Sequence, residues 1–333
     1  MPASLRDVAA AAGVSVKTVS NVVNNYQFVK HDTRARVLAA ITELDYRPNL
    51  SARRLRTGRS NLIALSVPQI QEPYFAELAG EVVEAAESHG WTVLIHRSGG
   101  QRTEVQRTAA RLRADLVDGA IASPLSITAQ DARELADAHH PLVLLGEPLP
   151  DVEASVVAID DLSAAAAATR HLIELGRTAI AAIGEAGERS GALRLRGFGN
   201  AIAETGRPVD PRLVVPVNRH HREEGYAAMV RLLSGDSRPD AVFCFNDLLA
   251  LGAIRAVVRA GLNVPRDVAV VGFDDIEDGR YGTPSLTTVS PDKAGIARAA
   301  VELLGRRIDT PAPGGAAETR ASYRLIVRES TAG

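Results

Sequence analysis

Four side chains near the N-terminus have the types and spacing to read DNA bases. Val16, Lys17, Ser20 and Asn21 are expected on the exposed face of a short helix that begins after Ser15. A lysine can bond guanine, an asparagine can bond adenine, and an apolar group can contact the methyl group of thymine. A helix in the major groove reads base edges near its own N-terminus, where these residues stand. The pattern predicts recognition of double-stranded DNA.

Two helices joined by a glycine turn are predicted to position this face. Ser4 and Asp7 have the spacing of a capping box, which indicates a first helix over residues 5–12. Gly13 then ends that helix, and Ser15 caps the second one. A helix, a glycine-centred turn and a second helix together form a helix-turn-helix unit.

A third helix is expected to close the core of this unit. Asp32 or Thr33 stands where it could cap the helix. Apolar residues then recur at helical spacing. They are Val37, Ala40, Ile41 and Leu44.

The charge of the chain is divided unevenly. Through Ser60, ten Lys and Arg residues oppose four acidic residues, a net charge of +6, whereas the remainder holds 28 basic and 36 acidic residues, a net charge of −8. Helix-turn-helix units also occur as plain packing elements, but the basic charge favours DNA binding. A length of 333 residues exceeds what one compact core usually fills. We therefore expect a small DNA-binding head joined to a separate acidic body.

Beyond Arg59, apolar runs typical of buried strands alternate with helical stretches. The strands are expected at 62–67, 91–96, 119–122, 142–145, 156–159, 179–183, 213–217, 241–245 and 268–273. The helices are expected at 73–89, 161–175, 194–204, 222–233 and 247–260. Continuous apolar strands with intervening helices indicate parallel sheets covered on both faces, here in two sets. The predicted fold is an all-α helix-turn-helix head followed by an α/β body of two doubly wound parallel-sheet subdomains.

Three polar residues are candidates for a ligand site between the two sheets. Arg194, Asn246 and Asp274 each stand just beyond a predicted strand or at the opening of a helix. Ligands of such folds bind beyond the carboxyl ends of the strands, so these side chains are expected to share a cleft. Their donors and acceptors suit a polyhydroxylated ligand.

The head resembles that of a known family. The segment DVAAAAGVSVKTVSNVVN, followed by TRARVLAAITELDYRPN, is similar to the headpiece of the LacI/GalR family of bacterial transcription regulators. Motifs of the body, such as PDAVFCFNDLLALGAIRA and GLNVPRDVAVVGFDD, extend the resemblance over nearly the whole chain. The body also resembles type I periplasmic sugar-binding proteins.

The resemblance implies a division of the chain and roles for residues of the head. The headpiece would be 1–47, the hinge helix or linker 48–59, and the effector-binding and dimerisation domain 60–333. The two subdomains would be about 60–160 with 290–320, and about 161–289 with 321–333. Val16, Lys17 and Asn21 would read bases. The residues near phosphates would be Ser15, Thr18, Ser20, Asn24, Thr33 and Tyr46. The hinge residues in the minor groove would be Asn49, Arg53, Arg54 and Leu55.

The same resemblance implies further residues of the effector site and the mode of action. The matching pocket positions are Tyr74, Phe75, Ser190, Arg194, His220, Asn246 and Asp274. The chain would be a repressor that binds a palindromic operator as a homodimer and is released by a small carbohydrate effector. A corepressor-dependent regulator, responding to a purine or another metabolite, is one alternative. A sugar-binding protein without DNA regulation is another.

Other features argue against enzymatic, metal and membrane functions. Cys244 lies in the apolar run AVFCF and is expected to be a buried strand residue, so no disulfide is predicted. The GFGN motif at Gly197 lacks the third glycine of a dinucleotide fingerprint, and no nucleophile or Walker motif is present. His139 with His140, and His220 with His221, lack metal-finger spacing and are expected to be solvated. No cofactor, metal or membrane partner is predicted, and the absence of a signal peptide indicates a cytoplasmic protein.

Overall fold

The computed structural model describes residues 3–23, 26–46, 59–98, 117–125, 127–137, 140–184, 189–310 and 316–332. The chain forms two compact units, a head of residues 1–60 and a body of residues 61–333. Each unit is described by itself.

The head contains three described helices around a small apolar core. They are α1 (Leu5–Ala12), α2 (Val16–Val23) and α3 (His31–Glu43). The predicted capping box is confirmed, because the Ser4 N–H donates to Asp7 Oδ2 at 2.8 Å and Ser4 Oγ accepts from the Asp7 N–H. Gly13 ends α1 with a φ of 62°, a left-handed conformation that glycine adopts at little cost. Val8, Val19 and Val37, one from each helix, are fully buried together.

The predicted cap of α3 is wrong. The helix begins at His31, and its cap residue, Lys30, makes no side-chain capping bond. Asp32 and Thr33 therefore lie inside the first turn. An acidic side chain there stabilises the helix through its charge near the positive end of the helix dipole, without acting as the cap.

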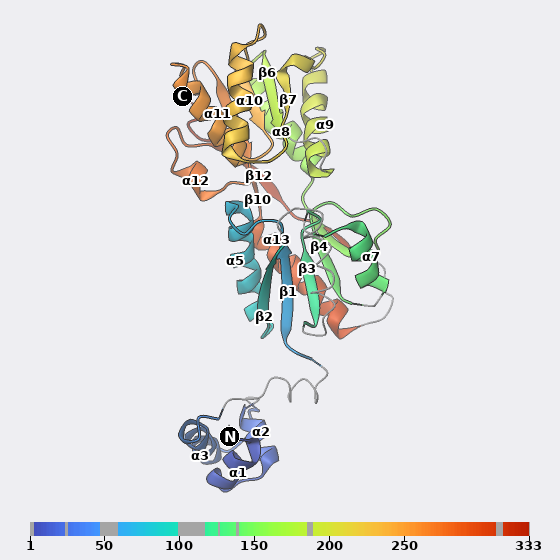
Figure 1. Cartoon of the computed structure of the whole chain (residues 1–333), viewed down its shortest axis with the longest axis vertical. Helices are drawn as coiled ribbons and strands as arrows, with labels where there is room; N and C mark the ends of the chain where they lie inside the picture. The colour runs from blue at the N-terminus through green and yellow to red at the C-terminus, as the bar shows by residue number, and fades with distance from the viewer. Residues whose placement is uncertain are drawn as a thin grey trace. The chain divides into compact units, whose positions relative to one another are not determined.

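The body contains two sheets of described strands (Figure 1). The order in the first is β11 (Glu318–Arg320), β5 (Ser155–Ala158), β4 (Leu142–Leu145), β3 (Gly119–Ala122), β1 (Leu62–Val67) and β2 (Thr92–Arg97). The order in the second is β12 (Tyr323–Ile326), β10 (Thr287–Pro291), β9 (Ala269–Phe273), β8 (Ala241–Cys244), β6 (Ile180–Gly184) and β7 (Val214–Pro216). Neighbouring described strands pair in parallel, except that β12 runs antiparallel to β10. The two predicted parallel sheets are thus confirmed.

Helices cover the sheets in packed pairs. In the N-terminal subdomain, which contains the first sheet, α5 (Pro73–Glu87) packs against α13 (Lys293–Asp309), and α7 (Ala129–Asp137) contacts β4. In the C-terminal subdomain, α8 (Asp161–Glu174) packs against α9 (Arg189–Ala203), and α10 (Arg222–Ser234) against α11 (Asp247–Arg259). The short helix α12 (Glu277–Arg280) follows β9. The apolar core lies between these helices and the sheets.

The glycine motif around Gly197 has a packing role. It lies inside α9, as the helical pattern predicted, and a Cβ at Gly197 would stand 2.2 Å from the Leu162 carbonyl oxygen. The glycine allows α9 to approach the backbone of α8 closely.

The chain passes between the two subdomains three times. The crossings lie between β5 and α8, between β10 and α13, and between β11 and β12. Helix α13 and strand β11 thereby return to the N-terminal subdomain, and the chain then adds β12 to the second sheet. Among the described residues, no helix combines the length and apolarity that a membrane span needs.

Candidate functional site

The outward face of α2 carries the residues expected to read bases. Val16 is 43% exposed and Lys17 is exposed, while Asn21 is half-buried. The opposite side of the helix contributes Val19 and Val22 to the core of the head. The core therefore fixes which side of α2 is available to a nucleic acid.

The residues expected near phosphates occupy different environments. Ser15 Oγ accepts from the Thr18 N–H at 3.1 Å and lies 2.9 Å from Thr18 Oγ1, so this pair caps the helix start, where backbone N–H groups favour an anion. Ser20 and Thr33 are half-buried. Tyr46 is only 8% exposed within the core of the head, and burial raises the pKa of its phenol. Its ring is a core component.

Several predicted residues lie outside the described part of the chain. They are Asn24, Asn49, Arg53, Arg54 and Leu55.

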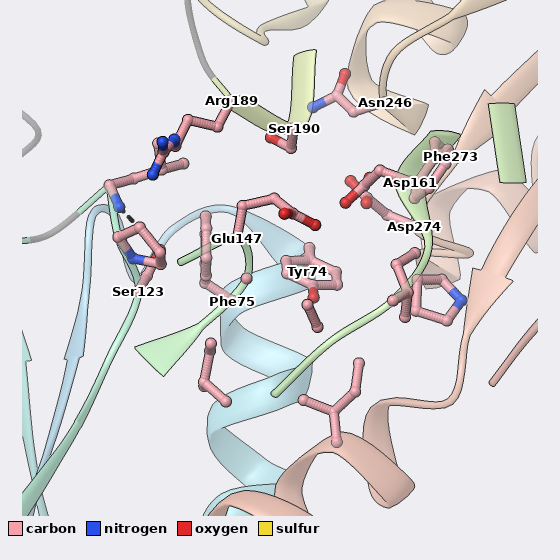
Figure 2. Close-up of a pocket in the computed structure, with 18 of the residues that line it drawn as sticks. Tyr74, Phe75, Ser123, Glu147, Asp161, Arg189, Ser190, Asn246, Phe273 and Asp274 are labelled. Carbon is pink, nitrogen blue, oxygen red and sulfur yellow. Dashed lines mark hydrogen bonds between the residues drawn. The ribbon is translucent and has the colours of Figure 1, made fainter. Parts of the chain in front are cut away.

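The predicted effector residues line one cavity of about 380 Å³ in the body (Figure 2). All seven are among its lining residues, and they come from both subdomains. They are Tyr74, Phe75, Ser190, Arg194, His220, Asn246 and Asp274.

The strand order explains why these residues meet. Tyr74 and Phe75 open α5 after β1, Ser190 and Arg194 lie in the first turns of α9 after β6, and Asp274 directly follows β9. Because the parallel strands of a sheet point their carboxyl ends the same way, side chains far apart in sequence reach the same edge of that sheet, and the cavity is lined from such an edge of each sheet.

Asn246 has a structural role at the carboxyl end of β8 in the second sheet. It is 6% exposed and caps α11, with its Oδ1 accepting from the Leu249 N–H at 2.9 Å. Its Nδ2 donates to the His220 carbonyl at 3.1 Å and so holds the loop that carries His220. Asn246 shapes the cavity, and its side-chain oxygen and one of its amide hydrogens are already bonded.

Arg194 is fixed on three sides. Its Nε donates to Asp161 Oδ1 at 2.7 Å, its Nη1 donates to the Phe245 carbonyl, and its guanidinium carbon lies 3.5 Å from the centroid of the Phe273 ring. Burial opposes the charge of Arg194, but Asp161 and Asp274 outweigh it and raise the pKa. The guanidinium is therefore a rigid positive group at the cavity wall.

Burial shifts the pKa values of three other groups around the cavity. It raises the pKa of Asp274 to about 7, with Arg194 opposing the rise. It lowers the pKa of His220 to about 4, so the imidazole is neutral at pH 7. It also raises the pKa of Tyr74, which keeps the phenol protonated. The expectation that His220 is solvated is therefore wrong, because the loop held by Asn246 places it at the cavity.

Sequence reasoning missed other lining residues. Asp161 begins α8, the helix that follows β5, so the same carboxyl-end rule could have identified it. Phe273, the last residue of β9, carried no signal apart from its apolar strand. A further set of lining residues belongs to the N-terminal subdomain, and its members are mostly apolar. They include Ser123, Pro124, Leu125, Leu145, Glu147, Leu149 and Val157.

Comparisons with known proteins identify the family. The family "Bacterial regulatory proteins, lacI family" matches residues 4–49, and the "Periplasmic binding protein-like domain" matches residues 169–331. The HTH-type transcriptional repressor PurR of Haemophilus influenzae (strain PittEE) is 34% identical over 333 residues, which cover 98% of each chain. The chain belongs to the LacI family of bacterial transcription regulators.

Two solved structures extend this likeness to the fold. A complex of the transcriptional regulator CelR with cellobiose is 32% identical, covers 98% of this chain and 99% of that chain, and has a TM-score of 0.74. The lac repressor dimer bound to operator and the anti-inducer ONPF is 28% identical, covers 99% of each chain, and has a TM-score of 0.85.

Family membership decides the general activity. This LacI-family protein is a DNA-binding transcriptional repressor, and its relatives are repressors rather than enzymes. LacI-family repressors act through operator DNA and small-molecule effectors. Within the described ranges, no group of three or more His, Cys, Asp or Glu side chains is placed to hold a metal ion.

Proposed function

We propose that this LacI-family repressor binds a palindromic operator as a homodimer and is released by a small carbohydrate that occupies the cavity between its subdomains. The observation that carries the proposal is the convergence of Arg194 and Asp274 on one cavity lined from both subdomains. A ligand that contacts both subdomains stabilises one arrangement of them, and this gives it control over DNA binding.

The DNA contacts are assigned to the head and to the segment that follows it. Val16, Lys17 and Asn21 read base edges in each half-site. Ser15, Thr18, Ser20, Asn24, Thr33 and Tyr46 lie near phosphates, with Tyr46 contributing mainly to the core. Residues 48–59 form the hinge, in which Asn49, Arg53, Arg54 and Leu55 contact the central minor groove. Exposure of the α2 face and the basic charge of the head support this assignment.

The electrostatics of the cavity favour an uncharged ligand with many hydroxyl groups. Two nitrogens of Arg194 are already bonded to Asp161 and to the Phe245 carbonyl, so its guanidinium is poorly placed to bind a phosphate bidentately. The ionised form of Asp274 can accept hydrogen bonds from paired hydroxyls. Glu147 is already paired with Arg320 at 2.8 Å, but the carboxylates of the lining, those of Glu72, Glu147, Asp161 and Asp274, still outnumber its guanidinium groups, those of Arg189 and Arg194, and this disfavours an anionic ligand further.

A purine-type effector is the second candidate. Tyr74 and Phe75 lie edge to face with ring centroids 5.2 Å apart, and both rings are part of the cavity lining. Aromatic and apolar walls suit a flat base. The similarity to PurR supports this alternative.

Selection from random DNA duplexes with the purified full chain tests the proposal. We expect a palindromic sequence to be enriched, and the bound complex to dissociate on addition of one member of a panel of ribose, glucose, cellobiose, guanine and hypoxanthine. Release by a sugar supports induction, whereas tightening by a purine supports the corepressor alternative. Enrichment of no sequence at low salt, where phosphate contacts are strongest, contradicts the proposed operator recognition.

A matched pair of head variants tests the reading face. Lys17→Ala is expected to change the selected sequence, because Lys17 is assigned to a base. Lys30→Ala removes the same charge from an exposed position outside α2 and is expected to leave the selected sequence unchanged. An identical selected sequence for wild type and Lys17→Ala would remove Lys17 from the base-reading set.

A further inference from the structure

Two charged residues of the N-terminal subdomain, Glu77 and Lys293, form a partly buried ion pair. Lys293 Nζ lies 2.5 Å from Glu77 Oε2, and the two side chains are 10% and 32% exposed. Glu77 belongs to α5 and Lys293 begins α13, two helices that pack against each other. Because Lys293 is almost buried, removal of Glu77 would leave its charge poorly compensated, which is not the case for a fully exposed ion pair.

Both members of the pair also bond the backbone of the C-terminal subdomain. Lys293 Nζ donates to the Asp275 carbonyl at 3.0 Å. Glu77 Oε1 accepts from the Glu277 N–H at 3.1 Å. Residues 275–277 are therefore held by one donor and one acceptor from the other subdomain. We call Glu77 and Lys293 the clamp.

The turn that the clamp holds is strained and fixed on its other side. Asp274 has a φ of 114° and Asp275 a φ of 50°, values that non-glycine residues rarely adopt. Asp275 Oδ1 accepts from Arg328 Nη2 at 2.6 Å, and the Ile276 N–H donates to the buried Asp247 Oδ2 at 2.9 Å. Such a backbone persists only where its surroundings hold it in place. The clamp supplies the N-terminal subdomain's part of that support.

The turn begins at a residue of the effector cavity. Asp274 lines the cavity and is followed directly by the clamped residues. On the other side of the clamp, Lys293 Nζ lies 5.8 Å from the ring centroid of Tyr74, which also lines the cavity. A movement of the subdomains that separated the clamp from residues 275–277 would therefore also change the position of Asp274 relative to Tyr74.

We propose that Glu77 and Lys293 are positioning residues, which hold the 274–277 turn so that Asp274 faces the effector in the subdomain arrangement in which the clamp bonds Asp275 and Glu277. The inference deepens the proposed function, because it rests on Asp274 as an effector contact. Through the clamp, the position of Asp274 in the occupied cavity would depend on the arrangement of the two subdomains.

Hydrogen exchange of the Glu277 amide in the ligand-free full chain tests the clamp without an effector. Glu77→Ala removes the acceptor of this amide and is expected to raise its exchange rate at least about tenfold, since a group that loses its bonding partner becomes open to water. Glu84→Ala, an exposed position two turns along the same helix, is expected to leave the rate unchanged. Equal rates in wild type and Glu77→Ala would overturn the clamp.

Ligand affinity tests the positioning role. The probe is cellobiose or whichever panel sugar binds the wild type, with its Kd measured by calorimetry. Lys293→Met, which keeps an unbranched side chain, is expected to weaken binding about tenfold through loss of the charge. Because Lys293 acts through Asp274, the double variant with Asp274→Asn is expected to bind no more weakly than Asp274→Asn alone.

The outcomes separate the inference from the proposed function. Strictly additive losses in the double variant would show that Lys293 does not act through Asp274, and would overturn the positioning role. If no panel sugar binds the wild type, the proposed effector class fails, while the Glu277 exchange rate still decides whether the clamp exists. Melting temperatures of all variants identify any loss that comes from unfolding.

Discussion

Asp161→Asn is expected to destabilise the body strongly, because it leaves the charge of Arg194 without its ion-pair partner. The Asp161 and Arg194 side chains are 6% and 13% exposed, and Arg194 Nε lies 2.7 Å from Asp161 Oδ1. A pair of the same length provides the control. Arg170 and Glu204 also lie 2.7 Å apart, but their side chains are 45% and 51% exposed.

The expected magnitude follows from burial. Removing one partner of a buried ion pair costs about 3–5 kcal/mol, because the remaining charge stays out of water without compensation. Asp274 also favours the charged form of Arg194 and can replace part of the lost interaction, so we expect a loss of about 2–3 kcal/mol in the free energy of unfolding. Glu204→Gln is expected to have a much smaller effect, because water solvates the remaining Arg170 charge.

Differential scanning calorimetry of the full chain measures the difference. For a cooperative unit of this size, about 2–3 kcal/mol corresponds to a fall in Tm of roughly 4–12 °C. Glu204→Gln is expected to change Tm by far less. Equal shifts for the two variants would refute the argument that burial, rather than bond length, decides the strength of these pairs.

Three further predictions follow from the packing and the titrating groups. Gly197→Ala should lower Tm, because its Cβ would stand 2.2 Å from the Leu162 carbonyl oxygen. Gly199→Ala should leave Tm unchanged or raise it, because its Cβ would meet its nearest atom at 3.9 Å. Equal changes in Tm for the two variants would contradict the close approach of α8 and α9. Sugar affinity measured by calorimetry should fall by up to about tenfold per pH unit as the pH drops below about 7, the pKa of Asp274, because the protonated carboxyl loses acceptor capacity. A Kd that stays constant from pH 8 to pH 6 would show that the ionised carboxylate of Asp274 does not bind the sugar. The raised pKa of Asp274 makes the folded state more stable as the pH falls from about 7 towards 4, whereas the pKa of His220, lowered to about 4, makes the folded state less stable as the pH falls below 6.5. Relative to wild type, Asp274→Asn should therefore be less stable at pH 5 than at pH 8, and His220→Gln should be more stable at pH 5 than at pH 8, as melting scans at the two pH values would show.

Local signals predicted the parts of the fold that depend on neighbouring residues. The capping box of α1 and the bounds of β1, β3 and β4 agree with the structure, because each is set by side chains within a few residues. The cap of α3 was wrong because several polar residues in succession are compatible with more than one helix start. Only the family resemblance assigned residues 290–320, which include helix α13 and strand β11, to the subdomain of the first sheet, because their place depends on chain crossings that no local pattern records.

In the candidate site, too, some residues could be predicted from the sequence, whereas the contacts of others depend on tertiary structure. Seven residues chosen from the family resemblance and the carboxyl-end rule surround one cavity. The carboxyl-end rule could have placed Asp161 at the cavity, but its ion pair with Arg194, 33 residues away, could not be read from the sequence. Tyr46 was expected near phosphates, and its burial in the core follows from the tertiary packing of α3 against α1 and α2. The Glu77–Lys293 clamp joins residues 216 positions apart, which sequence patterns do not connect.

A pair of linked titrations shows whether the cavity ligand controls operator binding. The Kd of the selected operator is measured with and without the releasing sugar, and the Kd of the sugar with and without the operator. Both affinities are expected to fall by the same factor, about 5–150-fold, because the coupling free energy between two sites is reciprocal. A sugar that binds the cavity and leaves operator affinity unchanged would show that the cavity ligand does not control DNA binding.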